Sequence, residues 1–223
     1  MGIFSTIKKG SFYTVGEEIS SSISHGVGAL LSIAGTVLLL VFSAMRGDGW
    51  KVVSSAIYGF SMILLFTMST LYHAITNERA KKVLRVFDHN SIFILIAGTY
   101  TPLTLVTLRK AGAWGWVIFG IVWAAAIVGV VLNSISVERF KRFSMACYIA
   151  SGWCIVMAFV PFVQNIEKTA LLWLIAGGLF YTVGIFFYRQ KSKKHFHAIW
   201  HWFVVAGAVC HYFCILFYVI LPV

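Results

Sequence analysis

Seven long apolar runs, separated by short polar segments, dominate the pattern along this chain. They lie at residues 25–45, 52–72, 90–108, 113–134, 144–164, 169–188 and 197–221, and none contains Asp, Glu, Lys or Arg. A run of about 17–25 apolar residues can cross the hydrocarbon of a bilayer as a helix. In lipid, a helix satisfies the backbone hydrogen bonds of such a segment internally. The pattern therefore predicts an all-α integral membrane protein, a bundle of seven transmembrane helices.

Composition agrees with this prediction. Of the 223 residues, 60% are hydrophobic and 11% are charged, whereas soluble domains carry about 25% charged residues. We expect one membrane domain over residues 1–223, with residues 1–24 as a short N-terminal segment. That segment lacks an apolar core, so no cleavable signal peptide is predicted. The net charge of +11 comes from loops that flank apolar runs, without a basic stripe interleaved with aromatics, so nucleic-acid binding is not expected.

The distribution of positive charge predicts the orientation. With seven spans, thirteen basic residues share the side of the N-terminus and five lie on the other side. The thirteen are Lys8, Lys9, Arg79, Lys81, Lys82, Arg85, Arg139, Lys141, Arg142, Arg189, Lys191, Lys193 and Lys194. Because cytoplasmic loops carry the excess of Lys and Arg, we expect a multi-pass cell-membrane protein with its N-terminus in the cytoplasm and its C-terminus outside.

A group of polar residues at the predicted cytoplasmic ends suggests a metal site. His197 and His201 are four residues apart and share one helix face, the spacing with which two histidines hold one zinc ion. His73 ends the second run and Asp88 precedes the third, at the same membrane level. Three imidazoles with an open water position are typical of catalytic zinc. The alternative is that His197 and His201 are simply interfacial aromatics.

The remaining polar residues have two interpretations each. Asp88 either caps the third span or, as we prefer, orients a zinc-bound water and accepts its proton. Ser69 either lines the site or bonds back to the carbonyl four residues earlier, which its spacing favours. Glu18 and His25 share a helix face and could support the site or close over it. His211 lies too deep to share the metal, and we expect a neutral, hydrogen-bonded interior histidine.

Four stretches carry a resemblance to a known family. They are EEISSSISHGVGA near the N-terminus, STLYH, the Asp88 region through GTYTP, and HAIWHWFVVAGAVCHY. In this order the chain resembles the bacterial hemolysin III proteins of the progestin and adipoQ receptor family, which is related to the alkaline ceramidases. The resemblance implies a seven-helix bundle with zinc near the cytoplasmic face, held by His73, His197 and His201. It also implies that Asp88 holds the zinc-bound water and that Ser69 lines the site.

These observations leave three hypotheses for the function. The first is a zinc-dependent hydrolase of a lipid amide, similar to a ceramidase, with a membrane lipid as substrate. The second is a sensor or regulator of the membrane state with a structural zinc. The third, a pore-forming hemolysin, is disfavoured because no polar stripe runs through several spans. The residues also suit other metals that prefer imidazole ligands.

Overall fold

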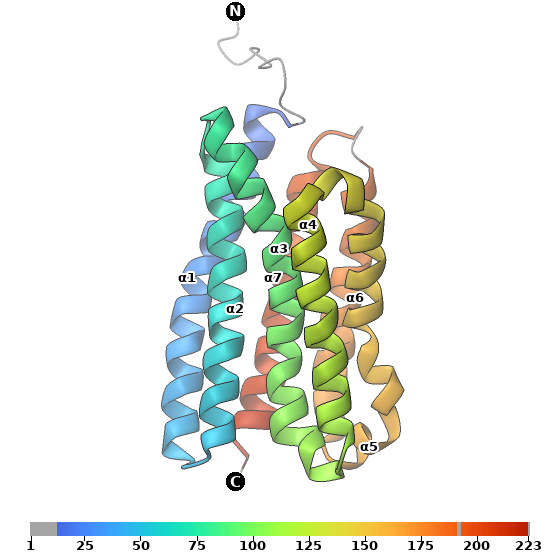
Figure 1. Cartoon of the computed structure of the whole chain (residues 1–223). Helices are drawn as coiled ribbons and strands as arrows, with labels where there is room; N and C mark the ends of the chain where they lie inside the picture. Colours follow the sequence, from blue (N-terminus) through green and yellow to red (C-terminus); the bar gives the residue numbers. More distant parts are fainter. Residues whose placement is uncertain (1–12, 191–192, 223) are drawn as a thin grey trace, which may run out of the picture.

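A computed structural model of the chain describes residues 13–190 and 193–222. Every regular element in these residues is helical (Figure 1). The α-helices are α1 (Val15–Met45), α2 (Gly49–Ala74), α3 (Glu78–Pro102), α4 (Trp114–Gly152), α5 (Phe159–Gln164), α6 (Lys168–Arg189) and α7 (Phe196–Ile215). Short 3₁₀ or π segments η1 (Leu103–Thr107), η2 (Leu108–Ala111), η3 (Cys154–Ala158) and η4 (Leu216–Ile220) extend or connect them. Within the described residues, six helical stretches are long and apolar enough to cross a membrane.

The predicted fourth and fifth spans fall within one of these stretches, Trp114–Gln164. Its 51 residues would be about 76 Å long as one straight helix, far more than the bilayer core of about 30 Å. The helix is interrupted at Ser136, whose φ of −165° and ψ of 107° are extended, and the ribbon turns back on itself there (Figure 1). The Ser136 hydroxyl accepts a hydrogen bond from the Arg139 amide at 3.2 Å, as a helix N-cap does. The separation of this stretch into two spans stays a prediction.

Helix α1 begins ten residues before the predicted first span. Thr14 and Glu17 form a capping box, in which each side chain accepts a hydrogen bond from the backbone of the other residue. The predicted N-terminal segment 1–24 is therefore partly helical, because polar residues continue α1 beyond its apolar run. Three of the basic residues used for the orientation, Lys8, Lys9 and Lys191, lie outside the described residues.

Helix α3 also begins earlier than predicted, at Glu78, and Asn77 caps it with bonds to the amides of Arg79 and Ala80. Asp88 consequently lies in the third turn of α3. The alternative that Asp88 caps the third span is wrong, because the hydrogen-bonded helix extends well past the apolar segment on which the prediction was based.

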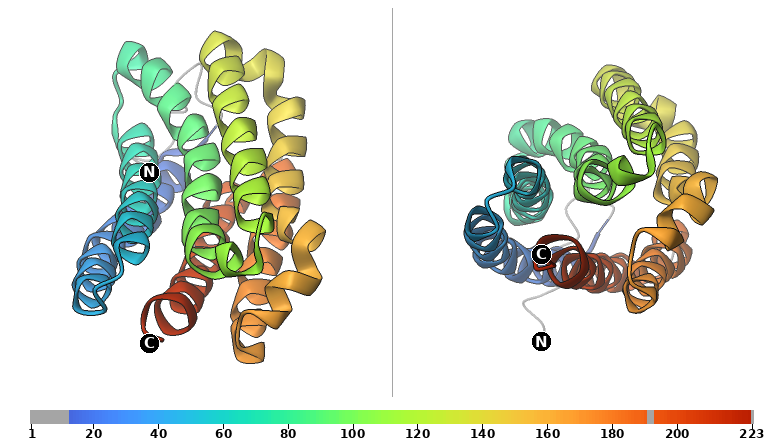
Figure 2. Two further views of the ribbon diagram at one scale, coloured as in Figure 1. Left: turned by 60° about the horizontal axis from the view of Figure 1, so that its bottom comes forward. Right: turned by 90° about the horizontal axis from the view of Figure 1, so that it is seen from below.

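The helices form a ring in chain order, which α7 closes by packing between α1 and α6 (Figure 2). The stretch Glu78–Ala111, which contains α3 and η1, is the most enclosed. In its most apolar segment, 83% of the residues are buried within the protein. Large apolar side chains elsewhere point outward, including Leu30 at 71% exposed and Leu172 at 69%. Exposed aliphatic surface of this extent suits lipid contact. The ring order brings the N-terminal part of α1, the end of α2 and the start of α7 to one end of the bundle.

Close approach of α3 and α4 depends on a glycine. A Cβ added at Gly129 would overlap the ring of Phe93, which is 2% exposed, whereas a Cβ at Gly120 of the same helix would meet no atom within 4 Å. We expect Gly129→Ala to lower the stability by about 1–3 kcal/mol, the usual cost of overpacking, and Gly120→Ala to be tolerated. Thermal denaturation of both variants in the same detergent measures this difference. Equal melting temperatures would show that α3 and α4 are not packed this closely.

Candidate metal centre

Three imidazoles from two helices meet at the end of the bundle where α1 begins. His73 lies in the last turn of α2, and His197 and His201 lie in the first two turns of α7. The Nε2 atom of His197 lies 3.4 Å from that of His73 and 3.1 Å from that of His201. When one nitrogen is taken from each ring, the three nitrogens all lie within 4.8 Å of one another. His73 is 4% exposed and His201 2%. The ring order of the helices thus brings together histidines that are up to 128 residues apart in sequence.

Two of the three nitrogen separations match those of ligands on one tetrahedral cation. With metal–nitrogen bonds of about 2.0–2.1 Å, two ligands at the tetrahedral angle are separated by about 3.3 Å. The observed 3.1 and 3.4 Å lie on either side of that value, and the remaining pair, His73 and His201, lies within 4.8 Å. Three neutral imidazoles without a thiolate are also a usual donor set for zinc that keeps a fourth position open. The residues present therefore fit a metal ion of this kind.

The carboxylate of Glu18 supports this group from α1. Its Oε2 atom lies 2.6 Å from Nδ1 of His73, and its Oε1 atom accepts a hydrogen bond of 2.7 Å from Nζ of Lys81. A hydrogen on Nδ1 of His73 satisfies the first bond and leaves the Nε2 lone pair for a metal. Carboxylates hold metal-binding histidines in this way, fixing the tautomer and the ring orientation. Glu18 therefore prepares His73 to be a ligand.

We expect Glu18→Gln to weaken metal binding by about 10- to 100-fold, the usual effect of removing such a support. The amide would keep the volume but lose the negative charge that pairs with Lys81 and strengthens the bond to His73. Glu138→Gln is the control, because Glu138 is an exposed carboxylate paired with Arg85 and Lys141. Competition with a chelator measures both affinities. Equal affinities in the two variants would contradict a supporting role for Glu18.

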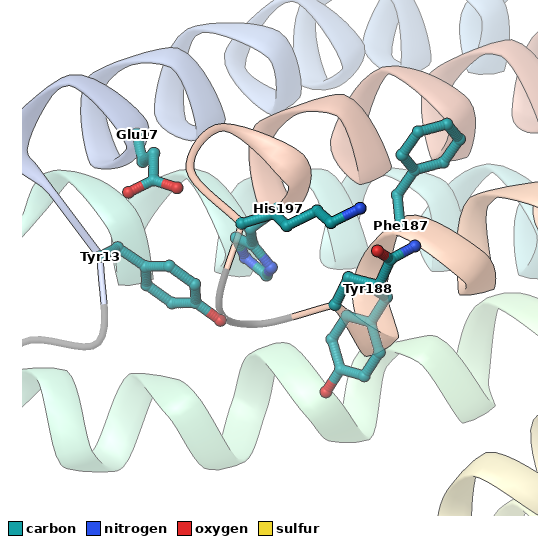
Figure 3. A pocket seen from close by; sticks show the side chains of 7 residues that line it. Tyr13, Glu17, Phe187, Tyr188 and His197 are labelled. Atoms are coloured by element: carbon teal, nitrogen blue, oxygen red, sulfur yellow. The ribbon is translucent and has the colours of Figure 1, made fainter.

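On the outer side of the centre, Tyr13 covers His197. Their rings stack with centroids 4.2 Å apart, and both line a small pocket that includes Glu17, Tyr188 and Lys193 (Figure 3). The pocket has room for about one water molecule. Glu17 fixes this arrangement, since its Oε1 atom accepts a hydrogen bond of 2.7 Å from the backbone amide of His195. The pocket forms a narrow outlet beside His197, the only one of the three imidazoles among its lining residues.

Asp88 lies close to the same outlet. Its side chain is 15% exposed, and its carboxylate lies 3.6 Å from Nδ1 of His89. Burial raises the pKa of Tyr13 well above its usual range, and the nearby carboxylates of Asp88 and Glu18 add to this effect. Tyr13 therefore stays protonated. The charge of Asp88 thus acts on Tyr13, the ring that covers His197. Asp88 does not belong to the group of three histidines that could hold a metal.

On the other side of the centre lie His25 and Ser69. The His25 ring lies 3.9 Å from that of His201 between centroids and meets Phe66 edge-on at 5.1 Å. Ser69 is 2% exposed and one turn from His73. Among the described residues, Ser69 makes no side-chain bond to the carbonyl of Leu65, in contrast to Thr70, which bonds to the carbonyl of Phe66 at 2.7 Å. Ser69 as a site residue stays a prediction.

His211 lies apart from the three clustered histidines. Nε2 of His211 bonds to the carbonyl oxygen of Leu174 at 3.2 Å, between α7 and α6, as expected for an interior histidine. The spacing of Glu18 and His25 correctly placed them near the site, on the same side of α1, but each contacts a different histidine of the group. Sequence reasoning missed Tyr13, because it precedes the apolar run and belongs to no motif.

Comparisons with known proteins identify chains of similar sequence. The chain is 42% identical to Hemolysin-3 of Bacillus cereus over 206 residues, which are 92% of this chain and 93% of that protein. It is also 42% identical to the Hemolysin-3 homolog of Bacillus subtilis (strain 168), over 92% of this chain and 96% of that protein. The human monocyte to macrophage differentiation factor is 26% identical over 89% of this chain and 83% of its own length.

A family model described as haemolysin-III related matches residues 13–212. This match runs from Tyr13 through α7 and includes all three imidazoles and Glu18. Since it covers most of the chain, and since two relatives share 42% identity over nearly their whole lengths, the chain belongs to the haemolysin-III related family of membrane proteins.

Proposed function

We propose that this protein is a zinc-dependent hydrolase that cleaves a lipid amide within the membrane. The observation that carries the proposal is the close approach of three imidazoles. Nε2 of His197 lies 3.4 Å from Nε2 of His73 and 3.1 Å from Nε2 of His201. Such a donor set leaves a fourth position on the cation, which catalytic zinc sites use for water or substrate.

Each residue of the centre has a chemical task in this proposal. Zinc in such a site makes water nucleophilic near neutral pH and polarises a carbonyl. The three imidazoles hold the cation, and Glu18 keeps His73 in the tautomer that binds it. Asp88 accepts the proton of the attacking water and passes it to the leaving amine, as a general acid–base does. The Ser69 hydroxyl donates a hydrogen bond to the oxygen of the acyl group.

A lipid substrate fits the environment of the centre. We infer that the chain crosses the membrane seven times, with Ser136 at the turn between the fourth and fifth crossings. The N-terminal end of α1 lies on the cytoplasmic side of the plasma membrane, because basic residues are in excess at that end. The imidazoles then lie at the inner leaflet, where an acyl amide would reach them sideways between helices while water enters by the pocket beside Tyr13.

A second function, a membrane-state sensor with a structural zinc, is favoured by one observation. The ring of Tyr13 covers His197, and the adjoining pocket holds about one water molecule. Such a narrow outlet suits a cation that clamps α2 to α7. This function predicts bound metal without turnover. A pore is not proposed, because the bundle interior contains large buried apolar side chains such as Phe66 and Phe93.

The experiment that tests the proposed function combines metal analysis with a hydrolysis assay. Purified protein is analysed for zinc and incubated with a panel of long-chain acyl amides and esters in micelles, and released fatty acid is measured. We expect about one zinc per chain and release of fatty acid that stops when a chelator removes the metal. Zinc without turnover on any lipid of the panel would favour the sensor, and protein without metal would overturn both functions.

A further inference from the structure

His25 is a buried imidazole that the proposed chemistry does not use. It is 4% exposed, and neither of its ring nitrogens makes a hydrogen bond of ordinary geometry with the described residues, the backbone of His201 being its one weak polar contact among them. A neutral imidazole has one N–H donor and one lone-pair acceptor. Each buried polar group left without a partner costs about 1–3 kcal/mol, so native structures fill such positions with water or a ligand. A polar group bound at His25 would therefore stabilise the ring.

The position of His25 relative to the metal centre follows from the helices. It is seven residues beyond Glu18 in α1, and its contact Phe66 is seven residues before His73 in α2. Seven residues of helix span about 10.5 Å. Because Glu18 and His73 contact each other, both helices place His25 deeper in the bundle than that pair. The pocket beside Tyr13 lies on the opposite, outer side.

The surroundings of His25 restrict what it can bind. Its ring packs between His201 and Phe66, and the nearby hydroxyl of Ser21 is also buried without a hydrogen-bond partner. Nδ1 of His201, which lies near the backbone of Ser21, is the fourth such atom after the two ring nitrogens of His25 and the Ser21 hydroxyl. This side of the centre holds unsatisfied donors and acceptors, and within the described residues no ion pair joins His25 or His201 to a carboxylate. An uncharged group with an oxygen atom, such as a carbonyl or a water molecule, fits these partners.

We propose that His25 binds the oxygen of an uncharged ligand beside the metal, on the membrane side of the three imidazoles. In the hydrolase, which this inference takes from the proposed function, the ligand is the acyl carbonyl of the lipid, and a water molecule replaces it when no lipid is bound. His25 then contacts the substrate without being a metal ligand. The centre has two sides, with water reaching it past Tyr13 and the acyl group past His25.

Infrared spectroscopy tests this binding without relying on turnover. Full-length protein carrying Asp88→Ala, chosen so that the amide is not consumed, is mixed with a long-chain N-acyl ethylamine with carbon-13 at the carbonyl. A hydrogen bond lowers the frequency of the labelled carbonyl band. We expect a lowered band that disappears when His25→Phe is added, since Phe keeps the ring but has no nitrogen. His211→Phe is the control, because within the described part of the chain that ring hydrogen-bonds to the carbonyl of Leu174 alone.

A second measurement on lipid-free protein distinguishes water from the carbonyl. Exchange into oxygen-18 water should reveal a buried-water band that His25→Phe removes. Loss of either band in His25→Phe supports the oxygen site and identifies its occupant. If neither band differs between the protein with His25 and His25→Phe, the proposal is overturned.

Kinetic measurements on His25→Phe test the role of His25 separately from the proposed function. His25→Phe should keep the zinc content and lower kcat/KM by about 10²-fold for any amide that the unmodified protein cleaves, the usual effect of losing one donor to a developing oxyanion. Loss of zinc in His25→Phe would make His25 a ligand and overturn its assigned role. Absence of hydrolysis in the unmodified protein would count against the proposed function, while the infrared result would still decide the role of His25.

Discussion

Protein carrying His197→Ala should purify without its metal, whereas the unmodified protein should contain about one zinc per chain. His197 occupies the middle of the group, with Nε2 atoms of the other two rings at 3.4 and 3.1 Å. Its loss leaves two imidazoles, fewer than the three protein ligands of catalytic zinc sites. The affinity should fall by more than the roughly 10- to 100-fold expected for a supporting residue. Elemental analysis after dialysis against a weak chelator measures this.

The control for this experiment is His89→Gln, which removes an imidazole at the same end of the bundle. Nδ1 of His89 bonds to the backbone carbonyl of Arg85 at 2.9 Å, and His89 is outside the clustered group. It should keep its zinc. Equal metal content in His197→Ala and the unmodified protein would refute the metal centre, and with it the hydrolase and the sensor.

The second large effect concerns Asp88. We expect Asp88→Ala to keep most of its zinc and to lose hydrolysis by about 10²- to 10⁴-fold, the contribution of a general acid–base. The physical reason is that Asp88 is close enough to affect Tyr13 but is not among the clustered metal-binding groups. Release of fatty acid and zinc content are measured on the same preparation.

Glu138→Gln serves as the matched control for Asp88→Ala, because it removes another carboxylate at this end of the bundle. Glu138 is paired with Arg85 and Lys141 at the surface, so hydrolysis should continue at the normal rate. If Asp88→Ala loses zinc together with activity, Asp88 is a ligand and its assignment as a proton acceptor fails. If Asp88→Ala remains fully active, another group accepts the proton.

The sequence determined the apolar helices and the pairing of His197 with His201. These features depend on local periodicity, because a helix fixes the direction of residues four apart whatever surrounds it. Hydropathy located the apolar part of each long helix but not its ends. The polar first turns of α1 and α3 continue beyond the apolar runs, since caps at Thr14 and Asn77 satisfy the free amides there. Asp88 was for that reason placed at a helix start that it does not occupy.

Only the tertiary structure decided which side chains meet. Glu18 and His25 share one side of α1, yet Glu18 contacts His73 and His25 contacts His201, because α1 packs against both α2 and α7. Tyr13 reaches His197 across 184 positions of sequence. Such contacts depend on the order and depth of the helices in the ring, which local sequence does not encode. The sequence therefore determined the candidate ligands, and the packing of α1, α2 and α7 determined their partners.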